Sequence, residues 1–193
     1  SYIGDLRPAN PSTFIIQYAD DLFLLVPITS SNSSTQLEQE IINIQQWASN
    51  NFLQLILSKC YVLPILKSAD PTLIHTLNHP KLKNIEVVTS VRFLGVYIDS
   101  RLSWQTHIQN VTSRAAQRLF PLRLLKPLVS RHQLSEIYTH TIRSLLEYCC
   151  PSFIGLSVQL SSSLETLQSR AHSIICHKDC KCSRLQPLTE RRL

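Results

Sequence analysis

The chain of 193 residues contains no methionine, only three glycines and no apolar run long enough to cross a bilayer. Because it begins with serine and has no methionine, it cannot start its own translation, and we expect it to be part of a longer protein. No signal peptide precedes the six cysteines, and Cys149 and Cys150 are adjacent, which argues against a secreted disulfide framework. We therefore expect an intracellular protein, nuclear or cytoplasmic, with reduced thiols and no membrane partner.

Positive charge is distributed unevenly along the chain. Residues 100–193 hold 13 Lys or Arg against 5 Asp or Glu, a balance of +8, whereas residues 1–99 hold 6 against 8, a balance of −2, which together give +6. A basic half beside a half with paired acids suits a protein that binds both a polyanion and a metal. A soluble protein whose surface is merely basic would show the same balance, so charge alone does not decide between them.

Two adjacent carboxylates, Asp20 and Asp21, lie within the stretch Phe14–Val26, between two short apolar runs rich in β-forming residues. Two such runs around a tight polar break predict a β-hairpin, although the break contains no Asn-Gly or Asp-Gly. Neighbouring like charges repel in an apolar setting, and a hard divalent ion such as Mg²⁺ would hold both ionised. A polar turn without a ligand is the alternative, and the acidic pair by itself favours it.

The tetrapeptide Tyr18–Asp21 resembles the Y-A-D-D signature of reverse transcriptases, and the wider chain resembles their non-LTR (LINE-type) retrotransposon branch. Trp47–Leu55, followed by Lys59, is similar to the next palm block of that family, and Arg92–Asp99 is similar to its F-L-G primer-grip hairpin. Three later stretches resemble its thumb and post-thumb segments: Trp104–Ile108, Ile142–Cys149 and Leu167–Ala171. Within polymerases a group II intron maturase or a telomerase-like enzyme is an alternative, but the stretches Leu145–Cys149 and Leu167–Ala171 favour the LINE type.

This resemblance implies an RNA-directed DNA polymerase that performs two-metal nucleotidyl transfer with Mg²⁺ or Mn²⁺. In the family the first aspartate of the block is a metal ligand, which is Asp20 here, and Asp21 is the adjacent carboxylate. Lys59 would stabilise the leaving pyrophosphate, and Tyr18 would pack beside the primer terminus. The implied partners are an RNA template, a DNA primer, deoxynucleoside triphosphates and an upstream fingers and palm segment of the same polyprotein. The primer-grip residues would be Phe93, Leu94 and Gly95.

Several of these assignments keep a simpler alternative. Lys59 can equally be a solvated surface lysine, because Ile56 stands where the family commonly has an asparagine. Gly95, predicted inside a strand, indicates a bulge or a close backbone approach to nucleic acid, and a packing glycine is the alternative. Asp5 lies in a stretch that resembles a structural helix end of the family, so we do not assign it to the site.

The fold class that these patterns predict is α+β: a partial polymerase palm over residues 1–99, followed by a helical thumb and post-thumb region over residues 100–193. The first part should contain the hairpin, a helix capped at Thr35 and ended near Asn50, a strand at 61–66, an irregular connector at 68–84, and a strand pair at 86–88 and 91–98. The second part should form a small bundle of three amphipathic helices. The first helix should end at the break made by Pro121 and Pro127. The second and third should begin at capping boxes opened by Ser130 and Ser162.

Two arginines of the first bundle helix, Arg114 and Arg118, are four residues apart and could contact nucleic-acid phosphates, although a solvated helix face is the alternative for each. The tail contains His172, Cys176, His177, Cys180 and Cys182, whose spacing includes one Cys-x₃-Cys pair but no second clean pair. We therefore expect free thiols there rather than a zinc site.

The expected activity requires an upstream aspartate and a glycine-containing nucleotide helix that this chain lacks, so by itself it should be inactive. A rival hypothesis is a catalytically dead retrotransposon relict that acts only as a nucleic-acid-binding module. A third is a helical protein-interaction bundle whose basic face is incidental.

Overall fold

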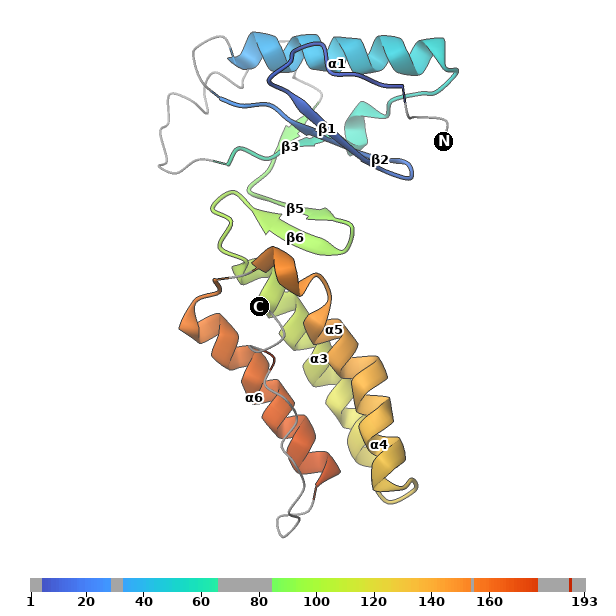
Figure 1. The fold of residues 1–193 in the computed structure, drawn as a ribbon, viewed down its shortest axis with the longest axis vertical. Coiled ribbons are helices and arrows are strands. Elements are labelled where there is room, and N and C mark those ends of the chain that lie inside the picture. The colour runs from blue at the N-terminus through green and yellow to red at the C-terminus, as the bar shows by residue number, and fades with distance from the viewer. Residues whose placement is uncertain (1–4, 29–32, 66–84, 154, 177–187, 189–193) are drawn as a thin grey trace. The chain divides into compact units, whose positions relative to one another are not determined.

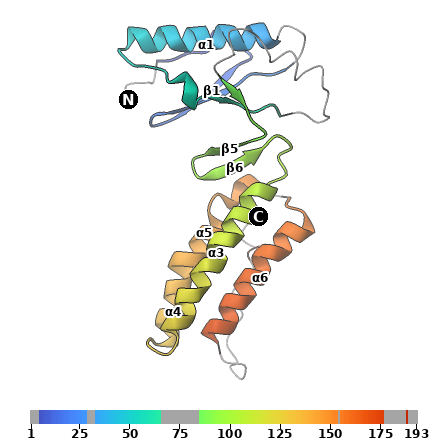
Figure 2. The same cartoon turned by 180° about the vertical axis from the view of Figure 1, so that it is seen from behind.

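The computed structural model describes residues 5–28, 33–65, 85–153, 155–176 and 188 of the chain. It contains helices and small two-stranded sheets, so the predicted α+β class is confirmed (Figures 1 and 2). The chain divides into two compact units, unit 1 over Ser1–Thr89 and unit 2 over Ser90–Leu193. The division at residues 89 and 90 differs from the predicted boundary at residues 99 and 100. The predicted connector at 68–84 lies outside the described residues.

Unit 1 begins with the predicted hairpin, in which β1 (Phe14–Tyr18) pairs antiparallel with β2 (Asp21–Leu25). The next helix, α1 (Ser33–Asn50), ends where it was predicted to end but contains Thr35 instead of being capped by it. Both views show α1 running across one side of the hairpin (Figures 1 and 2). The remaining elements are η1 (Leu57–Lys59), β3 (Tyr61–Val62) and β4 (Glu86–Val87).

The predicted strand pair at 86–88 and 91–98 is wrong. β4 pairs in parallel with β3, and the stretch that followed it folds back on itself as a separate hairpin of β5 (Ser90–Phe93) and β6 (Val96–Asp99). Its loop is Leu94–Gly95, with φ of 45° and 83°, the double positive φ of a type I′ turn. Gly95 is therefore a turn residue and not a bulge within a strand. The sequence pattern did not predict this turn, because leucine occupies the first loop position, where Asn or Asp is usual.

The buried carboxylate of Glu40 fixes the chain that leads into the hairpin onto α1. Its two oxygens accept hydrogen bonds from the backbone amides of Ala9, at 2.9 Å, and Asn10, at 2.8 Å. Glu40 is fully buried, and the apolar side chains of Ile44 and Ala48 on the same helix are also buried. The first strand of the hairpin thus starts from a point that is held by charge-assisted hydrogen bonds, which are stronger than neutral ones.

The helices of unit 2 form the predicted small bundle and lie side by side in both views (Figures 1 and 2). The core is formed by apolar residues at helical spacing, among them Leu119, Leu134, Ile142, Leu146 and Leu164. The first helix of the bundle is α3 (Gln105–Leu125). The second consists of α4 (Arg131–Tyr138), the π-helical turn η3 (Thr139–Arg143) and α5 (Ser144–Glu147), which follow one another directly. The short η4 (Cys150–Phe153) then leads to the third helix, α6 (Val158–Ile175).

Two predicted helix ends are wrong and one is confirmed. The capping box of Ser130 and Gln133 opens α4 as predicted. In contrast, α6 begins five residues before the predicted start, because Ser157 rather than Ser162 accepts the capping hydrogen bond, from the amide of Leu160 at 3.4 Å. Pro121 lies inside α3, which continues to Leu125. Burial of the neighbouring side chains in the bundle holds this turn helical despite the missing amide donor.

A buried histidine joins the second hairpin to the bundle. His107 of α3 accepts a hydrogen bond at Nδ1 from the amide of Tyr97 in β6, at 3.4 Å, and its ring centroid lies 5.5 Å from that of Phe153. Burial lowers the pKa of His107, so the imidazole is neutral at pH 7. This contact explains why the hairpin belongs to unit 2, whereas the sequence pattern grouped it with the strands before it.

Asp99 closes the turn between β6 and α3. Its carboxylate accepts four hydrogen bonds, from the backbone amides of Arg101, Ser103 and Trp104 and from the Ser103 hydroxyl. Burial by itself would raise the pKa of Asp99, but the hydrogen bonds together outweigh this and hold it below the ordinary value of 3.8. The ionised form is therefore the one that stabilises the fold.

We expect the stability of unit 2 to fall in acid because of Asp99. A lowered folded-state pKa stabilises the fold fully above the unfolded-state value near 3.8, and this contribution is lost as the pH falls through the folded-state pKa. Asp99→Asn should cost about 1 kcal/mol at pH 6, the typical net value of one hydrogen bond, and progressively less towards pH 2. Denaturant unfolding of both chains at several pH values measures this difference. A cost that is the same at pH 6 and pH 2 would contradict the assignment.

Candidate functional site

The predicted acidic pair lies at the tip of the β1–β2 hairpin. Tyr18 pairs directly with Asp21, so the connecting loop consists of Ala19 and Asp20 alone. Both aspartates are exposed, and among the described residues no cation forms an ion pair with either. Because directly paired residues share one face of a hairpin, the carboxylate of Asp21 lies beside the ring of Tyr18. The fold therefore presents two neighbouring carboxylates at one exposed turn.

The loop that carries Asp20 has an unusual backbone. Ala19 has a φ of 50°, in the left-handed region, while Asp20 has no positive φ. A positive φ at the first loop residue alone is the pattern of a type II′ turn, where glycine is the usual residue. A side chain in this conformation costs about 1 kcal/mol or more, and such residues cluster at functional sites.

One face of the hairpin that carries the acidic pair is apolar and exposed. The exposed fractions of Phe14, Ile16 and Tyr18, which alternate along β1, are 64%, 48% and 63%. The residues between them, on the other face, are half-buried. A two-stranded hairpin is marginally stable by itself and usually extends into a larger sheet or packs against further elements.

The donor set at the hairpin tip fits a hard divalent cation in part. Carboxylate oxygens are the ligands that Mg²⁺ prefers, and its sites commonly use only one or two protein carboxylates together with waters and substrate phosphates. Asp20 and Asp21 supply two such groups in an exposed position. Within the described residues, no cluster of three or more His, Cys, Asp or Glu could hold a metal by itself. The pair thus fits a metal that completes its shell with substrate.

Lys59 is the last residue of the short helix η1 and is exposed. In both views η1 lies beside the β1–β2 hairpin (Figures 1 and 2). Ile56 replaces the asparagine of the family motif, but its carbonyl accepts the amide of Lys59, at 3.0 Å, and the thiol of Cys60, at 3.4 Å. Backbone hydrogen bonding therefore closes this turn without the side-chain amide. Burial raises the pKa of the Cys60 thiol.

Asp5 has a structural contact. Its Oδ1 accepts a hydrogen bond from the indole Nε1 of Trp47, at 3.1 Å, and this contact fastens the start of the described chain to α1. The side-chain amide of Asn43 donates to the carbonyl of Arg7 one turn earlier along the same helix. These contacts agree with leaving Asp5 out of the site.

The predicted primer-grip residues lie together at the turn of the β5–β6 hairpin. Phe93 ends β5, and Leu94 and Gly95 form the loop. The hydroxyl of Tyr148, at the end of α5, donates to the carbonyl of Leu94 at 2.7 Å. A Cβ added to Gly95 would lie 3.6 Å from the Tyr148 ring. Sequence analysis missed this contact, because nothing in the local pattern connects residues separated by 54 positions.

We expect Tyr148→Phe to loosen this turn. Removing the hydroxyl leaves the Leu94 carbonyl without its donor, which should cost about 1 kcal/mol, the net value of a typical hydrogen bond. Amide hydrogen exchange of residues 93–96 should become faster in the variant. Tyr61→Phe is the matched control, because both tyrosines are 51% exposed and the control lies in unit 1. Equal exchange rates in the two variants would show that the hydrogen bond does not hold the turn.

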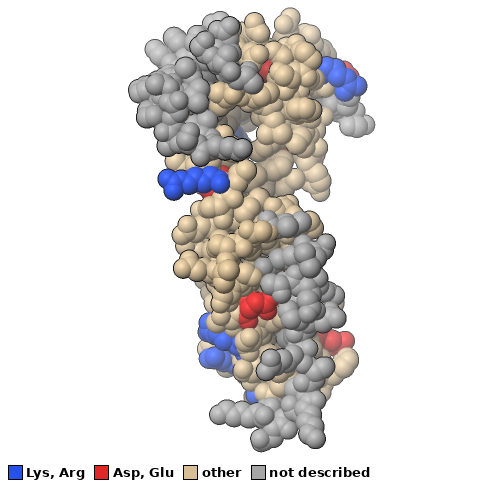
Figure 3. All heavy atoms as spheres, turned by 60° about the vertical axis from the view of Figure 1, so that its left-hand side comes forward, with Lys and Arg blue, Asp and Glu red and all other residues tan. Residues whose placement is uncertain are grey.

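Arg114 and Arg118 of α3 are both exposed, but they differ in their contacts. The guanidinium of Arg118 donates to the carbonyl of Thr141 in η3, where the π-helical turn disturbs the regular carbonyl pattern. Arg118 therefore has a structural contact besides any role in binding. On the face shown in Figure 3, Lys and Arg side chains over the helices form a small group beside isolated acidic ones.

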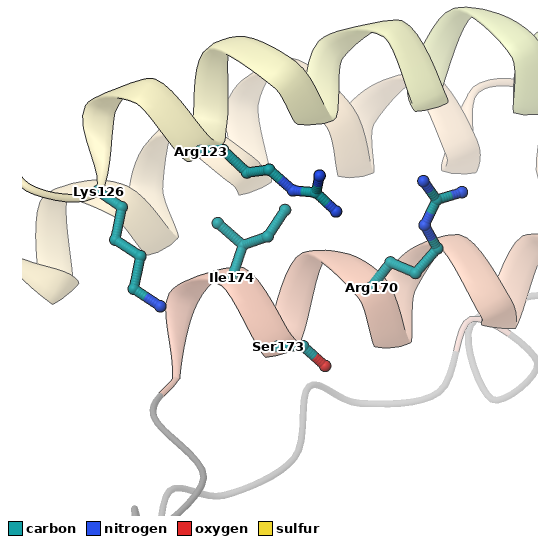
Figure 4. A pocket seen from close by; sticks show the side chains of 5 residues that line it. All are labelled: Arg123, Lys126, Arg170, Ser173 and Ile174. Carbon is teal, nitrogen blue, oxygen red and sulfur yellow. The ribbon is translucent and has the colours of Figure 1, made fainter.

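A second basic cluster, which sequence analysis missed, lines a hollow of about 350 Å³ between α3 and α6. Its lining residues are Arg123, Lys126, Arg170, Ser173 and Ile174 (Figure 4). Arg123 and Arg170 are far apart in the sequence and come together only through helix packing. No local spacing would have shown that they face one another.

The tail cluster is described only in part. His172 and Cys176 lie at the end of α6, and Cys176 is buried. The four cysteines within the described residues, Cys60, Cys149, Cys150 and Cys176, are free. His177, Cys180 and Cys182 lie outside the described residues, so the expectation about zinc remains a prediction.

Comparison with protein-family models, with curated proteins and with solved structures finds no match. Among the helices of the described residues, none has the length and apolarity needed to cross a membrane.

Proposed function

We propose that the chain is the C-terminal palm and thumb portion of an RNA-directed DNA polymerase of the non-LTR retrotransposon type. The single observation that carries the proposal is the pair Asp20 and Asp21, exposed at the two-residue turn of an antiparallel hairpin, in a motif that resembles the reverse-transcriptase signature. The positive φ of Ala19, next to the pair, adds support because strained residues are frequent at functional sites.

The candidate residues of the hairpin and of η1 would have different roles in catalysis. Asp20, and to a lesser degree Asp21, would hold Mg²⁺ or Mn²⁺, which supplies positive charge that lowers the pKa of the primer hydroxyl and balances the triphosphate. Tyr18, whose exposed ring lies beside Asp21, would contact the primer terminus. Lys59 would neutralise charge on the departing pyrophosphate.

The exposed apolar surface of unit 1 supports its being part of a larger domain. Phe14 and Ile16 on the hairpin, together with Phe52 after α1, are exposed to between 48% and 99%. Large apolar side chains gathered on one small unit commonly mark a surface that another element covers. Upstream fingers and palm elements would cover this surface and would also supply the further aspartate and the nucleotide-binding helix that catalysis requires.

The contacts of the β5–β6 turn support a role as primer grip. Tyr148 of the bundle holds its backbone through the hydrogen bond to the Leu94 carbonyl, and the Tyr148 ring lies where a side chain on Gly95 would point. A fixed, narrow turn is what positioning a primer end would require.

Primer extension tests two parts of the proposal: that the longer protein is a polymerase, and that this chain by itself is inactive. The chain alone, with Mg²⁺, an RNA template and a DNA primer, should give no product. The chain joined to the segment encoded upstream of Ser1 should extend the primer, and Asp20→Ala should abolish this extension. Robust synthesis by the isolated chain would contradict the view that it is incomplete.

The rival hypothesis is a relict that only binds nucleic acid, and the basic hollow of unit 2 favours some binding role for the bundle. That hypothesis expects salt-sensitive RNA or DNA binding, no extension even with the upstream segment, and no effect of Asp20→Ala. Failure to bind any nucleic acid at low salt would instead favour a protein-interaction bundle.

A further inference from the structure

Two arginines face each other across the hollow between α3 and α6. The side chains of Arg123 and Arg170 extend into this space toward one another, with Ile174 beneath Arg123 and Lys126 at one end (Figure 4). Arg123 and Arg170 are exposed, whereas Ile174 is buried and forms the apolar floor. Ser173 points away, and its hydroxyl donates to the carbonyl of Ser169 at 3.0 Å. The hollow is therefore open, and its polar groups are cationic.

No carboxylate balances this charge in the part of the chain that the structure describes. Among the described residues, no Asp or Glu lines the hollow, and no ion pair found there involves Arg123, Lys126 or Arg170. Like charges brought together in this way repel, and the repulsion is relieved when an anion lies between them.

Helix ends explain only part of the arrangement. Arg123 and Lys126 lie at the C-terminal end of α3, where the helix dipole favours cations. Arg170 lies more than one turn before the end of α6 and has no such support. An anionic ligand accounts for all three cations together.

The chemistry of the cluster points to a phosphate group. The guanidinium is a planar fork that donates two parallel hydrogen bonds to phosphate oxygens, and two such forks from different helices can hold one phosphate from both sides. Residues 100–193 have a balance of +8, which attracts a polyanion over a longer range.

We propose that the hollow lined by Arg123, Lys126 and Arg170 binds a backbone phosphate of single-stranded nucleic acid. This goes beyond Arg114 and Arg118, which lie elsewhere on α3, and it rests on the proposed function for the choice of nucleic acid as the source of the phosphate. Contacts of this kind fix the position of the strand without reading its sequence.

The test compares RNA binding by two double variants of the whole chain. Fluorescence anisotropy with a labelled single-stranded 20-nucleotide RNA is measured at several salt concentrations. Arg123→Gln with Arg170→Gln should weaken binding on the order of tenfold at 0.1 M salt, and the salt slope should become shallower by about 0.7, the value for one phosphate contact on a single strand. Arg7→Gln with Arg101→Gln is the matched control, because it also removes two exposed arginines, and it should weaken binding about twofold or less.

A second measurement uses the unmodified chain. Titration with inorganic phosphate, followed by amide chemical shifts, should move the signals of Arg123, Lys126 and Arg170 before those of other residues. This arm does not depend on the folding of any variant. Equal losses in the two double variants, or phosphate shifts elsewhere, would overturn the site.

The two measurements also distinguish nucleic acid from a small phosphorylated ligand, and failure of this site from failure of the proposed polymerase. Phosphate shifts at the hollow, combined with unchanged RNA binding by the Arg123 and Arg170 variant, would mean a small phosphorylated ligand and would overturn the choice of nucleic acid. If binding at the hollow is found while primer extension fails, the site stands and the polymerase proposal falls.

Discussion

Asp20→Asn is expected to reduce RNA-templated primer extension about a thousandfold in the chain joined to its upstream segment. The substitution keeps the size of the side chain and the turn, but it removes the negative charge that would hold the metal. A bound metal contributes several kcal/mol to stabilising the transition state, and each 1.36 kcal/mol is a factor of ten in rate. Initial rates of primer extension under saturating nucleotide measure this effect.

The neighbouring residues provide a graded comparison in the same assay. Asp21→Asn should have a smaller effect, because the proposal makes Asp20 and not Asp21 the principal metal ligand. Asp5→Asn is the matched control: it is also an exposed aspartate in unit 1, and asparagine can still accept the hydrogen bond from Trp47. Equal rates for Asp20→Asn and Asp5→Asn would remove Asp20 from the catalytic assignment.

Glu40→Gln is expected to destabilise unit 1 by about 3 kcal/mol. Both oxygens of the buried carboxylate accept backbone amides, of Ala9 and Asn10, and glutamine can offer only one acceptor. The other amide would face an N–H₂ group, which loses a charge-assisted hydrogen bond and leaves a donor without its partner. Amide hydrogen exchange of α1 and the hairpin within the whole chain measures the change in local stability.

The control for this substitution is Glu86→Gln, since Glu86 is an exposed glutamate of unit 1. It should change the stability of unit 1 by no more than about 0.5 kcal/mol, as surface substitutions usually do. Exchange rates in unit 2 should stay the same in both variants. A loss of similar size in Glu40→Gln and Glu86→Gln would show that the two hydrogen bonds contribute little.

The elements with a strong local signal were the ones the sequence predicted. The β1–β2 hairpin had two β-forming runs around Asp20 and Asp21, and α4 had a full capping box at Ser130. Buried positions along the bundle helices, such as Leu134 and Ile142, followed the helical spacing. In each case the local preference and the tertiary packing agree.

The errors occurred where tertiary contacts override local preference. Pro121 would end an isolated helix, but α3 continues because its neighbours are buried in the bundle. The β5–β6 turn uses Leu94 in a conformation that favours glycine or asparagine, and Tyr148 holds the turn from another element. Ser162, the predicted cap, lies inside α6, because the helix packs against the bundle from Leu160 onward and starts after Ser157.

The candidate site was predictable in one part and not in the other. Asp20, Asp21 and Tyr18 are contiguous, so a sequence motif is enough to place them at one turn. Arg123 and Arg170 are brought together only by the packing of α3 on α6. When residues of two separate helices form a site, no spacing within the sequence predicts that they lie together.

The most direct test of the central claim is a map of where a divalent ion binds on the unmodified chain. Mn²⁺ broadens the amide signals of nearby residues, and it can be added up to millimolar concentrations. We expect the broadening to centre on residues 18–22, and to disappear there in Asp20→Asn while any weak effect elsewhere is unchanged. Signals at 18–22 that stay sharp, or that broaden equally in Asp20→Asn, would contradict a metal-binding role of the hairpin and with it the proposed polymerase.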